Sequence, residues 1–81
     1  MHMDFTAHCR AMLQERAIPL EWVERTVGTP DRVEQHPGGL CHFLKKISEH
    51  DDRWLRVVVN VNAEPNRVVT AFFDRRMERK P

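Results

Sequence analysis

The sequence predicts an α+β domain in which two N-terminal helices pack on one face of an antiparallel sheet of three to four strands. Three observations predict it: the chain has 81 residues, its first third repeats apolar residues at helical spacing, and the remainder alternates apolar and polar residues. A chain of this length forms one domain and has little room for a deep enclosed pocket. We therefore expect a single two-layer domain over residues 1–81, with a basic tail at about 74–81.

Two amphipathic helices are expected before residue 30. The first begins after an N-cap at Asp4 or Thr6 and ends near Arg16. The second lies within "AIPLEWVERTVGTP", where Gly28 suits the C-terminal end and Pro30 forbids continuation. The apolar stripes of the two helices consist of Phe5, Cys9, Met12 and Leu13, and of Leu20, Val23 and Val27.

Strands follow, separated by turn sequences. "DRVEQH" is a short strand, "HPGG" is a turn in which glycines can adopt positive φ, and "LCHFLKKIS" is a strand whose facing is ambiguous. "RWLRVVVNVN" is the clearest strand, and "RVVTAFF" returns after the turn "AEPN". In the clearest strand we assign the core face to Leu55, Val57, Val59 and Val61.

The alternate residues of that strand predict a candidate interface. Trp54, Arg56, Val58 and Asn60 would lie on the sheet face opposite the helices, which a chain of 81 residues has nothing left to cover. An aromatic residue beside an arginine on an open sheet suits a protein partner, a second copy of the chain or stacked RNA bases. We expect Trp54, Val58 and Asn60 to form a partner interface.

Composition limits the function classes. The chain has 13 Lys and Arg against 12 Asp and Glu, so its formal charge of +1 is too balanced for a dedicated polyanion binder. Cys9 and Cys41 have no nearby cysteine partner, which indicates reduced thiols and a cytoplasmic protein. We expect no secretory signal and no membrane association, because no segment approaches ~18 apolar residues.

No metal or cofactor is expected either. His36, His42 and His50, even with Cys41, lack convincing metal-ligand spacing. A glycine-rich phosphate loop, a nucleophile elbow and paired catalytic carboxylates have no candidate in the sequence. If the protein is an enzyme, the sequence therefore leaves open only a reaction that needs no metal ion.

Several stretches in order along the chain carry a family resemblance: "ER" followed by "AI", "PDR" at a strand entry, "LRVVVNV", and the ending "RVVTAFFDRRMERK". From about His8 to Lys80 the sequence resembles the small bacterial proteins grouped as domain of unknown function 4258. That family is similar in architecture to RelE-like and BrnT-like toxins, small α+β ribonucleases that use histidine, arginine and lysine. The resemblance implies toxin-like RNA binding or cleavage, with RNA and an antitoxin as partners, although a fold does not fix a function.

Two residues of the first predicted helix are candidates for catalysis. His8 lies at the edge of the apolar stripe, where it is either a general acid or base or a boundary histidine bonded to backbone. Arg16 lies in line with the stripe, so its guanidinium group needs a partner. That partner is either a carboxylate such as Glu34 or Asp74, or a phosphate. If the chain cleaves RNA, Arg16 or Arg56 would stabilise the phosphate charge.

Basic residues complete the candidate RNA site. The predicted RNA-binding residues are Lys45, Lys46, Arg75, Arg76, Arg79 and Lys80. Two hypotheses therefore remain open. One is a RelE-like endoribonuclease that uses His8, Arg16 and Arg56, and the other is a non-catalytic interaction or dimerisation module that uses the Trp54 face.

Overall fold

A computed structural model of the protein describes residues 3–78. The elements in chain order are β1 (Asp4–Phe5), α1 (Ala7–Glu15), α2 (Leu20–Gly28), β2 (Arg32–His36), β3 (Leu40–Ile47), the 3₁₀ helix η1 (Ser48–His50), β4 (Arg53–Asn60), β5 (Arg67–Phe73) and the 3₁₀ helix η2 (Arg75–Glu78). The α+β class and both N-terminal helices are confirmed.

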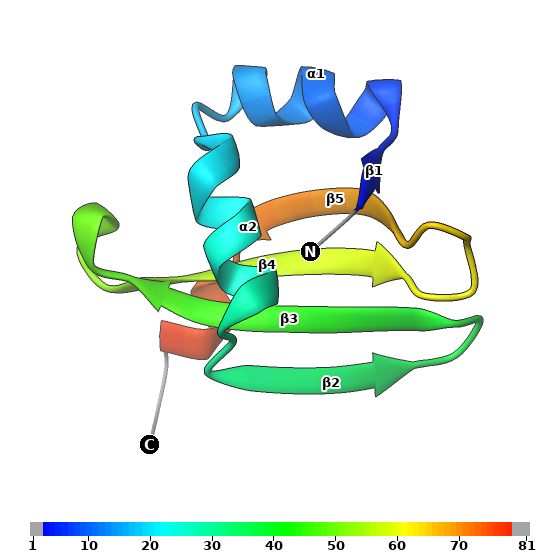
Figure 1. Ribbon diagram of the computed structural model, residues 1–81. Helices are drawn as coiled ribbons and strands as arrows, with labels where there is room; N and C mark the ends of the chain where they lie inside the picture. Colours follow the sequence, from blue (N-terminus) through cyan, green and yellow to red (C-terminus); the bar gives the residue numbers. More distant parts are fainter. Residues whose placement is uncertain (1–2, 79–81) are drawn as a thin grey trace.

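The sheet has five strands in the order β1-β5-β4-β3-β2 (Figure 1). β2 to β5 form the expected antiparallel meander. The prediction of three to four antiparallel strands is wrong in one respect, because β1 adds a parallel pair in which Asp4 lies opposite Arg67 and Phe5 opposite Val68. A two-residue strand is too short to show an alternation, so only its pairing reveals it.

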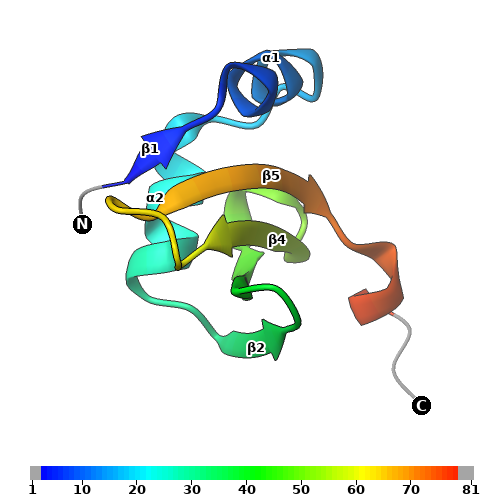
Figure 2. The ribbon, with the colours of Figure 1, turned by 90° about the vertical axis from the view of Figure 1, so that its right-hand side faces the viewer.

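The two helices pack on the sheet in different ways (Figures 1 and 2). α1 runs along β5 at one edge of the sheet, whereas α2 crosses the face formed by β3 and β4. Thr6 is the N-cap of α1, because its Oγ1 accepts a hydrogen bond from Cys9 N–H at 2.9 Å. In the described chain no helix is long and apolar enough to cross a membrane.

The main core lies between the helices and one face of the sheet. Its buried residues are Cys9, Leu13, Ile18, Val23, Val27, Ile47, Leu55, Val57, Val59, Val68 and Ala71. The core assignment of Leu55, Val57 and Val59 is confirmed. The assignment of Val61 to the core is wrong, because Val61 follows the last residue of β4 and is exposed where the chain enters the turn.

The face of the sheet opposite the helices, which we call the second face, is covered in part, contrary to expectation. Trp54 is only 8 % exposed, Arg56 and Val58 are also buried, and Leu44 is fully buried on the same face. The chain turns back after β5 so that η2 packs against β4 on the side away from α2 (Figure 2). The expectation of an uncovered Trp54 face is therefore wrong, because residues 74–77 and long charged side chains cover it.

The turn between β2 and β3 is built as the sequence predicts. Gly38 and Gly39 have φ of +82° and +76°, a conformation that side chains with Cβ rarely adopt. This tight turn sets the register in which Glu34 lies opposite His42. The turn thereby places Glu34 of β2 and His42 of β3 side by side on the second face.

Candidate functional site

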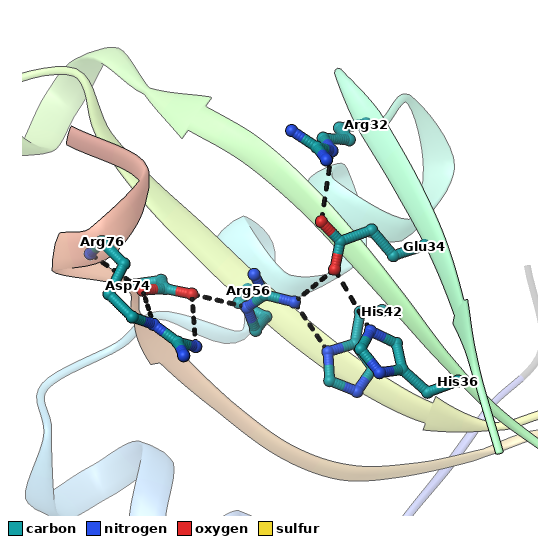
Figure 3. Close-up of polar contacts among 7 residues, drawn as sticks. All are labelled: Arg32, Glu34, His36, His42, Arg56, Asp74 and Arg76. Atoms are coloured by element: carbon teal, nitrogen blue, oxygen red, sulfur yellow. Dashed lines mark hydrogen bonds and ion pairs between the residues drawn. The ribbon is translucent and has the colours of Figure 1, made fainter. Parts of the chain in front are cut away.

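An arginine in β4 is the centre of a network of charged side chains on the second face of the sheet (Figure 3). Arg56 is 6 % exposed. Its Nε donates to Asp74 Oδ2 at 2.7 Å, and its Nη1 donates to Glu34 Oε1 at 2.9 Å and to His42 Nδ1 at 2.8 Å. We use the term polar network for Arg32, Glu34, His36, His42, Arg56, Asp74 and Arg76.

The two carboxylates extend the polar network toward solvent. Arg76 donates to Asp74 from its backbone N at 3.0 Å and from Nε and Nη2, each at 3.2 Å. Glu34 Oε2 lies 3.2 Å from Arg32 Nε, and Glu34 Oε1 lies 3.1 Å from His36 Nε2. Buried Arg56 thus fixes two carboxylates, and each carboxylate orients an exposed arginine.

Strand register assembles the polar network from three distant parts of the chain. Glu34 in β2 lies opposite His42 in β3, and Leu44, two residues further along β3, lies opposite Arg56 in β4. Residues two apart on a strand share a face, so His42 is a diagonal neighbour of Arg56. Asp74 follows β5, and its N–H donates to a β4 carbonyl at 2.9 Å, which holds its carboxylate beside Arg56.

The two histidines of the polar network have distinct roles. Their rings stack with centroids 3.8 Å apart and planes 21° apart. His42 Nδ1 accepts from Arg56, because a guanidinium group can only donate, so neutral His42 carries its proton on Nε2. Burial lowers the pKa of His42, and His36 and Arg56 lower it further. His36 donates from Nε2 to Glu34, which leaves its Nδ1 as an acceptor in the neutral ring.

Both carboxylates are held in their ionised form. Hydrogen bonds from Arg56 and then His36 lower the pKa of Glu34, and burial opposes them. Hydrogen bonds from Arg76 and Arg56 lower the pKa of Asp74 to about 2, although Asp74 is only 3 % exposed. The charges that surround buried Asp74 and partly buried Glu34 therefore outweigh the cost of removing each carboxylate from water.

The donor atoms of Glu34, His36 and His42 lie within 4.8 Å of one another, which raises the question of a metal ion. An ion bound by two imidazoles needs their in-plane lone pairs to converge. Here the ring planes are nearly parallel and stacked, so the lone pairs run side by side. Arg56 Nη1 also occupies the position between Glu34 Oε1 and His42 Nδ1. As arranged, these side chains fit a guanidinium group and not a single metal ion.

The structure does not bring the predicted catalytic residues together. His8 is exposed on α1, at the opposite edge of the sheet from β2. Arg16 donates from Nη1 to Ala71 O at 2.8 Å, so its partner is a backbone carbonyl of β5. The expectation that Arg16 pairs with Glu34 or Asp74 is wrong, because both carboxylates bind Arg56.

The predicted RNA-binding residues are also separated. Lys45 lies on the helix side of the sheet, where its Nζ donates to Thr29 O at 2.7 Å. Lys46 is exposed on the second face, with Nζ 5.7 Å from the centroid of the Trp54 ring. Arg75 and Arg76 are exposed on η2. Arg79 and Lys80 lie outside the described residues.

Little of the predicted partner interface is accessible. Trp54 and Val58 are buried, and Asn60, which is partly exposed, accepts a hydrogen bond from Asn62 N–H at 2.9 Å. These three residues lie on the expected face of β4, but η2 and the polar network cover most of them, so residues 3–78 present no broad apolar surface there. A partner that docks on this face would meet charged side chains first.

Sequence reasoning missed Glu34, His36, His42 and Arg32 as members of a site. A signal was available, because "RVEQH" places arginine, glutamate and histidine at a spacing of two, and the turn "HPGG" folds this strand onto "LCHFL". The spacing predicts a shared face for the three side chains. It does not predict that buried Arg56 joins them to Asp74, which requires the pairing of β3 with β4 and of β4 with β5.

A second feature lies away from the polar network. A depression of about 400 Å³ is present where α1 meets α2. It is lined by Arg10, Leu13, Gln14, Ala17, Ile18, Pro19 and Leu20. No residue of the polar network lines it, so it is not part of the same site.

Comparison with known protein families identifies the chain. Residues 5–73 match the family described as Domain of unknown function (DUF4258). The chain belongs to this family. No curated protein and no solved structure matches it. The resemblance to domain of unknown function 4258 is therefore confirmed, and the matched region contains every residue of the polar network except Asp74 and Arg76.

Proposed function

We propose that this DUF4258 protein binds RNA through the exposed part of its polar network and cleaves it without a metal ion, with His36 as the proton-transfer residue. The observation that carries the proposal is the pairing of His36 Nε2 with Glu34 Oε1 at 3.1 Å, on a sheet face that also presents exposed Arg32 and Arg76. A carboxylate behind an imidazole fixes the tautomer and the orientation of the ring.

The chemistry follows from the free nitrogen of His36. With Nε2–H held by Glu34, Nδ1 accepts a proton from a ribose 2′-hydroxyl group. The 2′ oxygen then bonds to phosphorus, the bond from phosphorus to the 5′ oxygen breaks, and water protonates the leaving oxygen. Arg32 and Arg76 stabilise the phosphate charge, since each uses only part of its guanidinium group on a carboxylate.

A second candidate function is supported by the charge of the polar network. Its three arginines are opposed by two carboxylates, which leaves a small positive excess. This weak excess, with a formal chain charge of only +1, favours a protein-interaction module over a strong polyanion binder. RNA binding and protein binding are separated by the experiments that follow.

Fluorescence anisotropy with a labelled single-stranded RNA oligonucleotide tests binding. We expect the wild type to bind at low salt, and Arg76→Ala to reduce the slope of log affinity against log salt by about 0.7. Arg53→Ala is the matched control, because Arg53 is exposed but lies on β4 opposite Ile47, on the helix side of the sheet. Absence of wild-type binding at low salt, or equal effects of the two substitutions, contradicts the proposed interface.

Growth after induced expression tests the proposed reaction. We expect the wild type to arrest bacterial growth, and His36→Ala, at equal soluble expression, to relieve the arrest. His8→Ala is the matched control, because His8 is also exposed but lies on α1. Relief by His8→Ala alone would instead support His8 as the proton-transfer residue. Equal growth of all three cultures would contradict the proposed RNA cleavage and favour the non-catalytic protein-interaction module.

A further inference from the structure

The two edges of the sheet differ in how they are covered. At one edge β1 pairs with the start of β5, and α1 runs along the rest, with Arg16 donating to Ala71 O. At the other edge lies β2, and no described element packs beyond it (Figure 1). β2 is flanked by Pro30 and Pro37 but contains no proline itself. An uncovered edge of this kind is a template for pairing with another strand.

The backbone groups that face the free edge follow from the hydrogen-bond pattern. Val61 N–H donates to Gly39 O at 2.9 Å, so odd-numbered residues of β3 direct their backbone groups toward β4. The even-numbered residues of β3 then face β2, where they lie opposite its even-numbered residues. Val33 and Gln35 therefore direct N–H and C=O outward, away from β3.

The side chains of β2 are complementary to a second copy of the same strand. Val33 is 50 % exposed, which makes it the most exposed of the large hydrophobic residues in the described chain. An antiparallel pair with Val33 opposite Val33 buries both side chains and places Arg32 opposite the partner's Glu34 on the other face. Both ion pairs form at once, because a two-fold axis relates them.

Other registers are less favourable. Pairing centred on Glu34 places two like charges directly opposite each other. Pairing centred on Gln35 places Val33 opposite Pro37 of the turn, where no apolar strand residue covers it. The register centred on Val33 is thus the one in which apolar contact and charge both match.

We propose that two copies of this chain pair through β2, in the register centred on Val33, to form one continuous sheet. The occupant of the free edge is then a second copy, because the strand is complementary to itself in charge and in its one exposed apolar side chain. The interface sets the two polar networks side by side across the two-fold axis, since Arg32 and Glu34 belong to both the interface and the network. A small domain with limited core also gains stability from such pairing.

Multi-angle light scattering over a series of protein concentrations tests the pairing. Val33→Pro removes the outward N–H without removing a hydrogen bond to β3, and Val33→Thr keeps that N–H and is the matched control. We expect the wild type and Val33→Thr to be dimeric and Val33→Pro to be monomeric, with unchanged far-ultraviolet circular dichroism. A wild type that remains monomeric at all concentrations, or a Val33→Pro variant that remains dimeric, overturns the proposal.

Disulfide cross-linking tests the register and does not depend on the proline variant. Hydrogen-bonded residues opposite each other lie about 5.5 Å apart between Cα atoms, within the range that a disulfide spans. Because Gln35 lies opposite Cys41 within the chain, both variants are made in a Cys41→Ser background. There we expect Val33→Cys to give a covalent dimer on mild oxidation and Gln35→Cys to give none, while native Cys9 stays buried. Cross-linking of Gln35→Cys but not Val33→Cys would refute the Val33-centred register. Light scattering and cross-linking both measure the association of two chains, so their outcome does not depend on whether the protein binds RNA.

Discussion

The two faces of the sheet are buried by different means. On one face, apolar side chains from two helices cover Leu55 and its neighbours, and burial depends on the hydrophobic effect. On the other face, Leu44 is equally buried, but it lies opposite Arg56, whose carboxylate partners and η2 form the cover. The difference shows that a small domain can cover its second face with paired charges. This cover leaves the charged and polar side chains of Arg32, His36 and Arg76 exposed at the surface.

The largest expected effect compares two fully buried leucines, one on each face. Leu55→Ala is expected to lower the free energy of unfolding by about 3–5 kcal/mol, because the helices cannot collapse into the cavity. Leu44→Ala is expected to cost about 2–3 kcal/mol, because η2 and long side chains can move inward. Urea denaturation of both variants measures the difference. A larger cost for Leu44→Ala would mean that the polar face is the more rigid of the two.

The second prediction removes the centre of the polar network. Arg56→Ala is expected to lower the free energy of unfolding by about 1–3 kcal/mol, because buried Asp74 then retains only Arg76 and Glu34 keeps only its more exposed partners. Arg16→Ala is the matched control: it removes one hydrogen bond to Ala71 O and is expected to cost about 1 kcal/mol or less. Equal costs for both variants would show that the buried network adds no stability of its own.

The third prediction uses pH to weaken the cover of the second face, and the Asp74→Asn variant separates this effect from the titration of other carboxylates such as Glu49. Because the pKa of Asp74 falls from 3.8 to about 2 on folding, its contribution is present above pH 4 and is lost as pH falls toward 2. The loss is about 2 kcal/mol for a shift of this size. Thermal unfolding of the wild type and Asp74→Asn across this pH range measures it. The Asn variant, which cannot titrate at this position, is expected to show a shallower acid destabilisation, and parallel curves would contradict the assignment.

Much of the fold could be predicted from local patterns. The helical stripe of "LEWVERTVG" and the alternation of Leu55, Val57 and Val59 each indicate an element and the face that it buries, because a regular element repeats its environment at a fixed spacing. The glycines of the β2–β3 turn are likewise predicted by the positive φ that the turn requires. β1 could not be predicted, because two residues contain no period.

The candidate site was harder to predict than the fold. His8 and Arg16 attract attention by their place on a helical wheel, but the partner of Arg16 is a backbone carbonyl of a strand 55 residues away. Arg56 was expected to be an exposed phosphate ligand, and it is instead a buried residue that holds Glu34, His42 and Asp74 together. A charged residue in an alternating strand has a predictable face, whereas its partners depend on which strands lie beside it.

The sequence by itself determined the α+β class, the two helices, the four longer strands and the family. Only the tertiary structure decided that the second face is closed by charge, and that His36, His42 and Glu34 lie together beside Arg56. The physical reason is that secondary structure depends on residues within a few positions of one another. Ion pairs between strands depend instead on register, and register is set by the whole sheet at once.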